Sequence, residues 1–443
     1  MPRTIQHPAR LVPLALLVTI LVGTVLLMLP MSRADPGGAP LLIALFTSTS
    51  AVCVTGLAVQ DTATYWSGFG QGVILALSQI GGFGIMTGAT LLGLLVTRRL
   101  RLSTRLIAQA ETRSIALGEV AGLLRLIFLV TVSVELAAAA ILTLRLRYAY
   151  QEPWEQAIWN GLFHAISAFN NAGFSTYSDG MMRFVADPVV IMTVTVAVVL
   201  GGLGFPVLYE LRRKLRHPAR WSIHTKITLL GTAVLLPAGW AAVLAFEWSN
   251  PDTLGPLDLT GKLLASMFHS AMTRSGGLNS VDIGKMELET LAVSYVLMLI
   301  GGGSASTAGG IRVTTFLLLG FVVLAEIRGE PDTTAFRRRI SSEVQRQALS
   351  VVLLAVGLVA LATLLLLVLT DFALHDVLFE AISACATVGL STGITPKLPP
   401  AAQFVLVVMM FAGRVGTVTI ATAFALRMRK RPYRYPEERP IVG

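Results

Sequence analysis

Four short segments of the chain share a composition suited to holding a cation through oxygen atoms. Each opens on a phenylalanine, continues through small and polar residues, and reaches a glycine that precedes a bulky apolar residue. The phenylalanines recur about every 110 residues, at Phe46, Phe163, Phe268 and Phe379. Glycine is favoured where the backbone takes a positive φ or approaches another segment closely. The repeat predicts four glycine loops with equivalent roles, at Gly56, Gly173, Gly277 and Gly389.

Long apolar runs stand before and after each segment and must position it. The chain of 443 residues is 54% apolar and only 14% charged, whereas soluble domains carry about 25% charged residues. A run of about 20 apolar residues spans a bilayer. The runs cover residues 11–30, 71–96, 121–144, 188–211, 227–246, 291–325, 349–369 and 404–426. They predict eight crossings, and the shorter glycine segments should enter the membrane as re-entrant half-helices.

The predicted fold is therefore an all-α integral membrane protein. It has four pseudo-symmetric membrane–pore–membrane repeats, with eight transmembrane helices and four re-entrant pore helices around one ion pore. The predicted repeats cover residues 1–100, 101–220, 221–340 and 341–443, the last including a C-terminal tail. The first run could also serve as a cleaved signal peptide, although it is longer than the usual apolar core of about 7–15 residues.

Irregular backbone is tolerated within a bilayer only where it is buried in protein or lines a water-filled cavity. Four glycine loops that converge on one axis could aim their carbonyl oxygens at a dehydrated cation. The residues predicted to form this filter are Cys53, Val54, Thr55, Gly56, Asn170, Asn171, Ala172, Gly173, Ser275, Gly276, Gly277, Ala386, Thr387, Val388 and Gly389. The alternative is that each glycine is a helix-packing position.

A second glycine-rich stretch interrupts the apolar run over residues 291–325. Each glycine costs about 1 kcal/mol relative to alanine inside a helix, so this crossing should be broken at its centre. The freed backbone should face the cavity below the filter and act as a gate. This stretch consists of Gly301, Gly302, Gly303, Ser304, Ala305, Ser306, Thr307, Ala308, Gly309 and Gly310. A passive kink is the alternative.

Arg414 lies in the middle of the last apolar run, where a charge costs about 2.5–3.5 kcal/mol and needs partners. Carbonyl oxygens of residues 301–310 are the preferred candidates, because a guanidinium can donate to several oxygens at once. Glu135, which is alone inside residues 121–144, is the competing partner. Arg312 is expected to reach the cytoplasmic interface by snorkelling.

Several polar residues beside the glycine segments are expected to brace them. Arg274 should hydrogen-bond loop backbone, and His164 and His269 occupy equivalent positions in their segments. Each of three acids follows a glycine segment closely and could either bind hydrated cations or order the outer turn. These acids are Asp61, Asp179 and Asp282.

The 35 Lys and Arg residues concentrate in alternate loops, which predicts cytoplasmic termini by the positive-inside rule. The outer side is then acidic, which raises the local concentration of cations. The basic residues are spread over several loops without a nucleic-acid-binding motif, so no nucleic-acid partner is expected. Arg212–Arg216 and Arg337–Arg339 are candidate docking sites for a partner protein or anionic lipid.

Two other functional classes fit less well. An intramembrane hydrolase or lipid-modifying enzyme built on Ser391 or Ser304 would need a base near its nucleophile, yet the histidines lie in pore segments or loops. A secondary transporter should show two broken helices at corresponding positions, and the sequence predicts only one. No P-loop is present, so nucleotide control would come from another protein. We expect no enzymatic activity and no covalent cofactor.

The motifs resemble those of the Trk, Ktr and HKT superfamily of potassium transporters over essentially the whole chain, and most of all the bacterial Ktr membrane subunit. The strings that carry the resemblance are TSAVCVTGL (residues 49–57), FNNAGFS (169–175), GGGSASTAGGIR (301–312), ATVGLSTG (386–393), FAGRVG (411–416) and PEERPIVG (436–443). Cys53 departs from the family pattern, which commonly has threonine there.

The resemblance implies a potassium-translocating subunit of the bacterial plasma membrane, with K⁺ held by the filter carbonyls. It further implies a homodimer with one pore per subunit, embedded in membrane lipids. K⁺ symport with Na⁺, or activation by Na⁺, and control by a cytoplasmic nucleotide-binding regulatory ring also follow from the resemblance. It matches residues 301–310 to an intramembrane gating loop.

Overall fold

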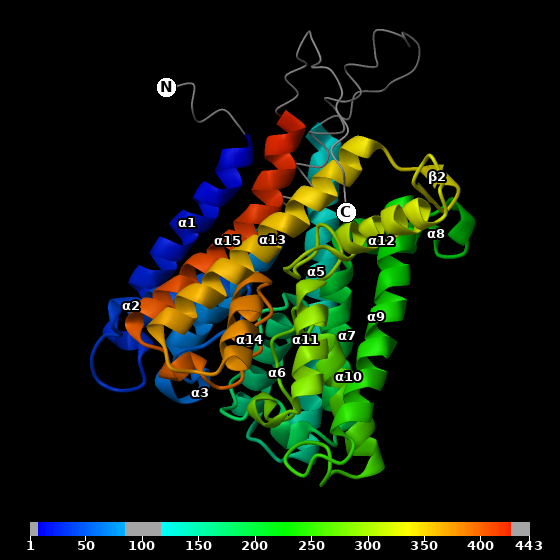
Figure 1. Cartoon of the computed structure of the whole chain (residues 1–443). Helices are drawn as coiled ribbons and strands as arrows, with labels where there is room; N and C mark the ends of the chain where they lie inside the picture. Colours follow the sequence, from blue (N-terminus) through cyan, green and yellow to red (C-terminus); the bar gives the residue numbers. More distant parts are fainter. Residues whose placement is uncertain (1–7, 85–116, 427–443) are drawn as a thin grey trace.

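A computed structural model describes residues 8–84 and 117–426, which are mostly helical (Figure 1). Short helices alternate with long ones along the chain. The short helices that lead into the glycine segments are α2 (Leu41–Val52), α6 (Trp154–Phe169), α10 (Leu259–Met272) and α14 (Leu374–Cys385). The long helices before them are α1 (Pro8–Leu27), α5 (Leu117–Ala149), α9 (Ile223–Glu247) and α13 (Ser342–Leu369).

A further helix follows each glycine segment. The first covers residues 68–84; the others are α7 (Pro188–Leu203), α11 (Leu288–Leu299) and α15 (Pro400–Leu426). The smaller elements are α3 (Thr62–Tyr65), α8 (Phe205–Lys214), α12 (Val313–Ile327) and a hairpin of β1 (Thr334–Ala335) with β2 (Arg338–Arg339). The order of long and short helices follows the repeat seen in the sequence.

Local sequence signals begin several of these helices. Asp187 precedes Pro188 and accepts bonds from the first free amides of α7, and Ser222 does the same for α9 through the amide of Thr225. Asp258 caps α10 through the amide of Gly261. Such caps satisfy amides that have no partner within the helix.

Within the described residues, three helices are long and apolar enough to cross a membrane, or four if the bent pair of α7 and α8 is one span. The number of crossings in the whole chain therefore stays a prediction. The expectation of one continuous helix over residues 188–211 is wrong, because α7 and α8 meet at 96°. The bend falls at Gly204, whose φ of +90° is left-handed, and Pro206 follows within α8.

The break predicted within residues 291–325 is present between α11 and α12. Residues 301–310 form an irregular loop, and α12 then runs across the long helices rather than along them (Figure 1). A second break, at Gly204, was not expected. The helical path is thus interrupted twice, after α7 and after α11, and the two breaks lie next to each other.

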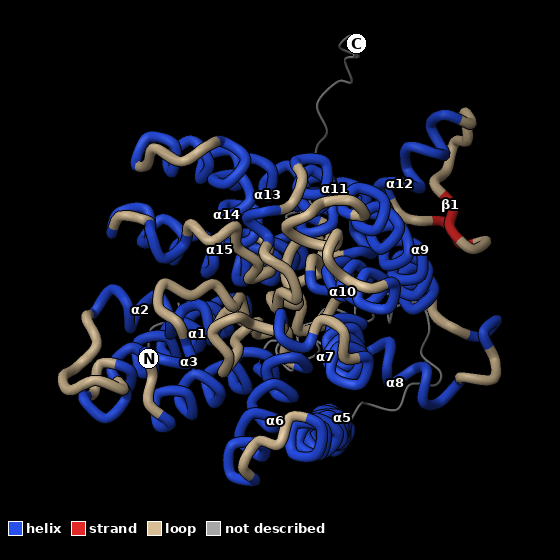
Figure 2. The backbone as a smooth tube through the Cα atoms, turned by 90° about the horizontal axis from the view of Figure 1, so that it is seen from below, coloured by secondary structure: helices blue, strands red, loops and turns tan. Residues whose placement is uncertain are grey.

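The core lies where the short helices end. The four repeat phenylalanines are all fully buried, and the small residues after them pack against neighbouring helices. Viewed from below, the loops that follow the short helices gather in the centre of the ring of helices (Figure 2). Segments that are far apart in sequence therefore meet at the centre of the molecule.

Candidate functional site

The four glycine segments, residues 53–56, 170–173, 274–277 and 386–389, share one backbone conformation. Each glycine has a left-handed φ, of +98° at Gly56, +72° at Gly173, +72° at Gly277 and +93° at Gly389. The residue two positions earlier is left-handed in every segment as well. These residues are Val54, Asn171, Ser275 and Thr387. Left-handed backbone is unfavourable for such residues, so its recurrence marks a shared structural requirement.

The four glycines lie against one another. A Cβ added at Gly56 would stand 2.7 Å from the carbonyl oxygen of Ala172, and one added at Gly173 would stand 2.9 Å from the Cα of Gly277. A Cβ at Gly389 would come within 2.0 Å of the carbonyl oxygen of Thr55. Because these neighbours are backbone atoms, no side chain fits at these positions. The packing role considered for separate glycines does not explain why all four meet each other.

Each short helix presents its segment through local hydrogen bonds. The amides of Thr55 and Ala172 donate to the carbonyls of Ser50 and Ser167, at 2.8 and 2.7 Å. The fourth segment repeats this bond from Val388 to Ser383 at 2.8 Å, and in the third the amide of Gly276 donates to Met272 at 2.8 Å. The carboxyl ends of the helices therefore lead into the meeting point, and that end carries partial negative charge.

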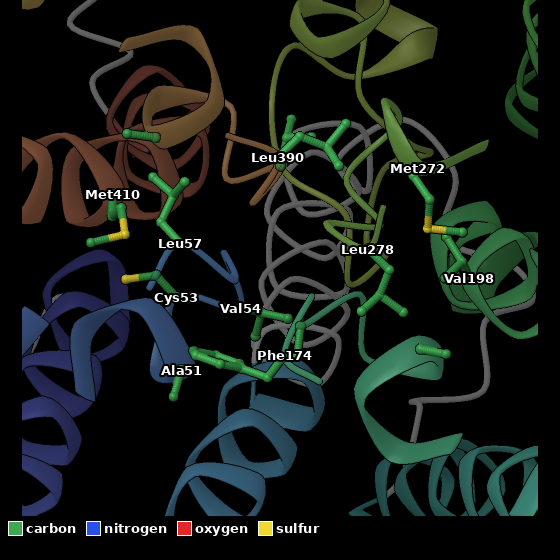
Figure 3. Close-up of a cluster of buried hydrophobic side chains, with 14 of the residues drawn as sticks. Ala51, Cys53, Val54, Leu57, Phe174, Val198, Met272, Leu278, Leu390 and Met410 are labelled. Carbon is green, nitrogen blue, oxygen red and sulfur yellow. The ribbon is translucent and has the colours of Figure 1, made fainter. Parts of the chain in front are cut away.

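The bulky residue after each glycine anchors its segment from behind. Leu57, Phe174, Leu278 and Leu390 come from the four different segments, and all are nearly or fully buried. Figure 3 places them around a common centre, packed among other core residues such as Val198 and Met410. Apolar packing by these four residues and backbone contact between the four glycines together hold the segments in place.

The outer sides of the segments are braced by polar pairs. His164 Nε2 lies 2.9 Å from Ser175 Oγ, and His269 Nε2 lies 2.9 Å from Ser294 Oγ. In the fourth repeat Glu380 accepts bonds from Ser391 and Thr395. These contacts agree with the bracing role expected for the two histidines.

The three outer acids order the turns around them. Asp61 accepts the amide of Ala63 and the hydroxyl of Thr64, and Asp179 pairs with Arg183 at 2.7 Å. Asp282 accepts the amide of Gly284. Each acid therefore has a structural partner, which favours a role in ordering the outer turn over a role in binding hydrated cations.

The intramembrane loop, residues 301–310, lies directly against the glycine segments. Its Thr307 hydroxyl donates to Asn171 Oδ1 at 3.0 Å, and its Gly309 amide donates to Ser275 Oγ at 3.0 Å. The end of α7 contributes as well, because the carbonyl of Gly202 accepts the Gly303 amide at 2.7 Å. The loop is thus held by groups from other parts of the chain.

Two arginines clamp this loop, Arg414, which is buried, and Arg312, which is partly buried. Arg414 donates to the carbonyl of Thr307 and lies 3.3 Å from Thr387 Oγ1, as the sequence favoured. Arg312 donates to the carbonyls of Gly303, at 3.3 Å, and Ala308. The expectation that Arg312 reaches the cytoplasmic interface is wrong, because its side chain turns back and donates to carbonyls of the loop.

Arg274 joins the third glycine segment to the loop. Its guanidinium donates to the carbonyl of Gly301 at 3.3 Å, so it braces backbone as expected, although the backbone belongs to the intramembrane loop. Glu135, the alternative partner of Arg414, is hydrogen-bonded to Asn170 and Gln79. The sequence signal for that contact was only a lone acid in an apolar helix, which does not identify its partner.

The hydroxyls considered as nucleophiles have structural contacts. Ser391 bonds to Glu380 and Thr395, and Ser304 lies 2.9 Å from Thr314 Oγ1. Among the residues that the structure describes, neither hydroxyl is hydrogen-bonded to a histidine. The arrangement can offer rings of backbone oxygen to a cation, with the loop of residues 301–310 beside them.

The chain is similar to known proteins over nearly its whole length. Residues 13–432 match the family model described as TrkH, cation transport protein. The chain is 40% identical to Ktr system potassium uptake protein B of Bacillus subtilis over 436 residues, covering 98% of this chain and 97% of that protein. It is 32% identical to the potassium/sodium uptake protein NtpJ of Enterococcus hirae, covering 98% and 97%.

A solved structure shares the fold. The potassium transporter TrkH from Vibrio parahaemolyticus superposes with a TM-score of 0.68 at 18% identity, covering 92% of this chain and 84% of that one. These relatives are transporters rather than enzymes, and the apolar helices agree with a multi-pass membrane protein. The resemblance read from the sequence motifs is confirmed: the chain belongs to the TrkH family of cation transport proteins.

Proposed function

We propose that the chain is the potassium-translocating subunit of a K⁺ uptake system in the bacterial plasma membrane, with channel-like permeation. The named activities of the relatives in Bacillus subtilis and Enterococcus hirae support potassium as the ion. The near full-length coverage of those relatives supports a common activity for the whole chain.

The glycine segments are the proposed selectivity filter. Carbonyl oxygens of Thr55, Ala172, Gly276 and Val388 stand one residue before the four glycines and would replace the water around a K⁺ ion. The single observation that carries this proposal is the mutual contact of the four glycine backbones. Oxygens from four segments around one axis suit a hard monovalent cation and need no side-chain chemistry.

The intramembrane loop is the proposed gate. It lies beneath the filter, bonded to Asn171 and Ser275, and Arg414 adds a positive charge beside it. A cation that leaves the filter would meet this charge and the loop backbone together. Permeation would then require residues 301–310 to move aside.

The assembly around this subunit follows the family. We infer a homodimer with one pore per subunit, embedded in membrane lipids and controlled by a cytoplasmic nucleotide-binding ring. Na⁺ is the proposed activator or co-transported ion, an assignment supported by the potassium/sodium name of the Enterococcus hirae relative. Both termini are assigned to the cytoplasm, and residues 1–7 and 427–443 lie outside the described residues.

Ion flux into liposomes containing the purified chain tests the proposal. We expect uptake of K⁺ that exceeds uptake of Na⁺ and increases when the cytoplasmic partner is added. Liposomes that carry a Gly389→Ala variant provide the control for leak. Equal entry of K⁺ and Na⁺ when each ion is supplied alone, or no entry above the control with the partner present, would contradict the proposed function.

A further inference from the structure

Glu135 is a buried carboxyl group within α5, in the part of that helix that is apolar enough to cross a membrane. The residue is only 5% exposed. A charged or polar group at this depth is expensive unless it is hydrogen-bonded. Its presence therefore calls for an account of what the carboxyl group holds in place.

The carboxyl group is bonded by two neutral amides from two other elements. Asn170 Nδ2 donates to Glu135 Oε1 at 2.9 Å, and Gln79 Nε2 donates to Glu135 Oε2 at 3.2 Å. Asn170 Nδ2 also donates to Gln79 Oε1 at 2.6 Å. The three side chains form a closed network that joins α5, the helix over residues 68–84 and the end of α6.

Asn170 is the residue from which the second glycine segment starts. It is the C-cap of α6, directly before the left-handed Asn171 and three residues before Gly173. Its side chain is fully buried and packs tightly, since a Cβ added at Gly82 would come within 2.1 Å of Asn170 Oδ1. The network thus fixes the base of this segment between α5 and the helix over residues 68–84.

The other three segments are held differently at the same position. Cys53 and Ala386 have no amide or hydroxyl to offer, and Arg274 is bonded to the intramembrane loop. The second segment is the one whose base is fixed to long helices by a buried carboxyl group. Because this contact occurs at the second segment alone among the four, it indicates a role for Glu135 in that segment rather than a general role in the core.

We propose that Glu135 is a positioning residue for ion selectivity, acting through Asn170 on the second filter segment. The inference rests on the proposed function. Without the carboxyl group, Asn170 keeps its bonds to Gln79 Oε1 and to the carbonyl of Ile166 but loses the bond that ties it to α5. The carbonyl of Ala172 can then shift relative to the other three segments. A displaced oxygen changes the size of the ring of filter carbonyl oxygens. We expect this change to alter the preference for K⁺ over Na⁺ more than it alters total flux.

The test measures the ratio of K⁺ to Na⁺ flux in liposomes for the full chain with its cytoplasmic partner. Glu135→Ala should lower this ratio about fivefold, the scale of one lost hydrogen bond of ordinary net strength. Glu135→Gln should keep most of the ratio, because glutamine can still accept one amide and can donate to Asn170 Oδ1, which has no partner at present.

A double-mutant cycle with Asn170→Ala shows whether Glu135 acts through Asn170. We expect Glu135→Ala to have little further effect on the ratio once Asn170 has been replaced. If Glu135→Ala does not yield a monodisperse protein, Gln79→Leu removes the other amide and should lower the ratio in the same direction. An unchanged ratio in Glu135→Ala, or an equal drop in both backgrounds, would overturn the inference.

Glu247→Ala is the matched control for loss of a buried carboxyl group. Glu247 is also fully buried, but it lies at the end of α9 and accepts bonds from Asn250, Thr253 and the amide of Glu287. This variant should lower stability without changing the flux ratio. If the wild-type chain passes no K⁺, the proposed function itself fails; if it selects K⁺ and Glu135→Ala does so equally, only this inference fails.

Discussion

The glycine segments and the intramembrane loop are both irregular backbone among apolar helices, but they are held in different ways. Each glycine segment is fixed by its own short helix, through amide bonds such as Thr55 to Ser50, and by the apolar residue after the glycine. The loop depends on distant groups, including Arg414, Ser275 and the carbonyl of Gly202. Local support suits a filter that keeps its dimensions, and distant support suits a loop that can be released.

The largest effect should come from the locally held segments. Gly389→Ala would place a Cβ within 2.0 Å of the Thr55 carbonyl oxygen, at a φ of +93°. We expect K⁺ uptake in a potassium-auxotrophic strain to fall about a hundredfold, which corresponds to about 2.7 kcal/mol. Gly393→Ala is the control for backbone strain alone, because Gly393 also has a left-handed φ, of +89°, but a Cβ added there would have no atom within 4 Å. Equal loss in both variants would contradict the proposed role of the four-way contact.

Release of the loop should have a smaller effect in the opposite direction. Arg414→Ala removes donors to the Thr307 carbonyl and to Thr387 Oγ1, and a bond to a charged group contributes about 1.5–3 kcal/mol. We expect K⁺ flux into liposomes without the partner to rise about tenfold, with the K⁺ to Na⁺ ratio retained.

Arg145→Ala is the control for Arg414→Ala, because it removes an arginine that pairs with Asp187 at 2.9 Å away from the loop. Its basal flux should equal that of the wild type. Lower flux or loss of selectivity in Arg414→Ala would mean that the loop also supports the filter, which contradicts separate support for the two regions.

The smallest effect concerns the corner behind the loop. Gly204 directly precedes α8 and lies beside Ser304. Glu210 ties α8 to the start of α9 by accepting bonds from Ser222 and Thr225. Partial burial raises the pKa of Glu210, but these bonds and Lys214 outweigh it and lower the pKa to about 2. The ionised carboxylate therefore stabilises the folded state above the ordinary glutamate pKa, and this contribution is lost as the pH falls towards 2.

Glu210→Gln should accordingly lower the Tm of the detergent-solubilised protein by about 2 °C at pH 7. The difference from the wild type should shrink as the pH is lowered from about 4.5, the ordinary glutamate value. Thermal unfolding followed across this range checks the sign. A difference that grows on acidification would mean that Glu210 does not anchor α8 through its ionised form.

Sequence reasoning could locate the glycine segments because their pattern recurs with the same glycine and apolar neighbour. It could also locate the break at residues 301–310, where glycines crowd an apolar run. It missed the bend at Gly204, although Gly201, Gly202 and Pro206 stood nearby as signals, because the surrounding residues remain apolar. The direction of Arg312 and the partners of Glu135 depend on helices far away in the sequence, which no local pattern reveals.

Anomalous X-ray diffraction from crystals in which Rb⁺ replaces K⁺ tests the central claim most directly. The account predicts anomalous density on the axis between the four glycine segments, surrounded by the carbonyl oxygens of Thr55, Ala172, Gly276 and Val388. Rubidium bound only elsewhere, for example beside the outer acids Asp61 and Asp179, would contradict it.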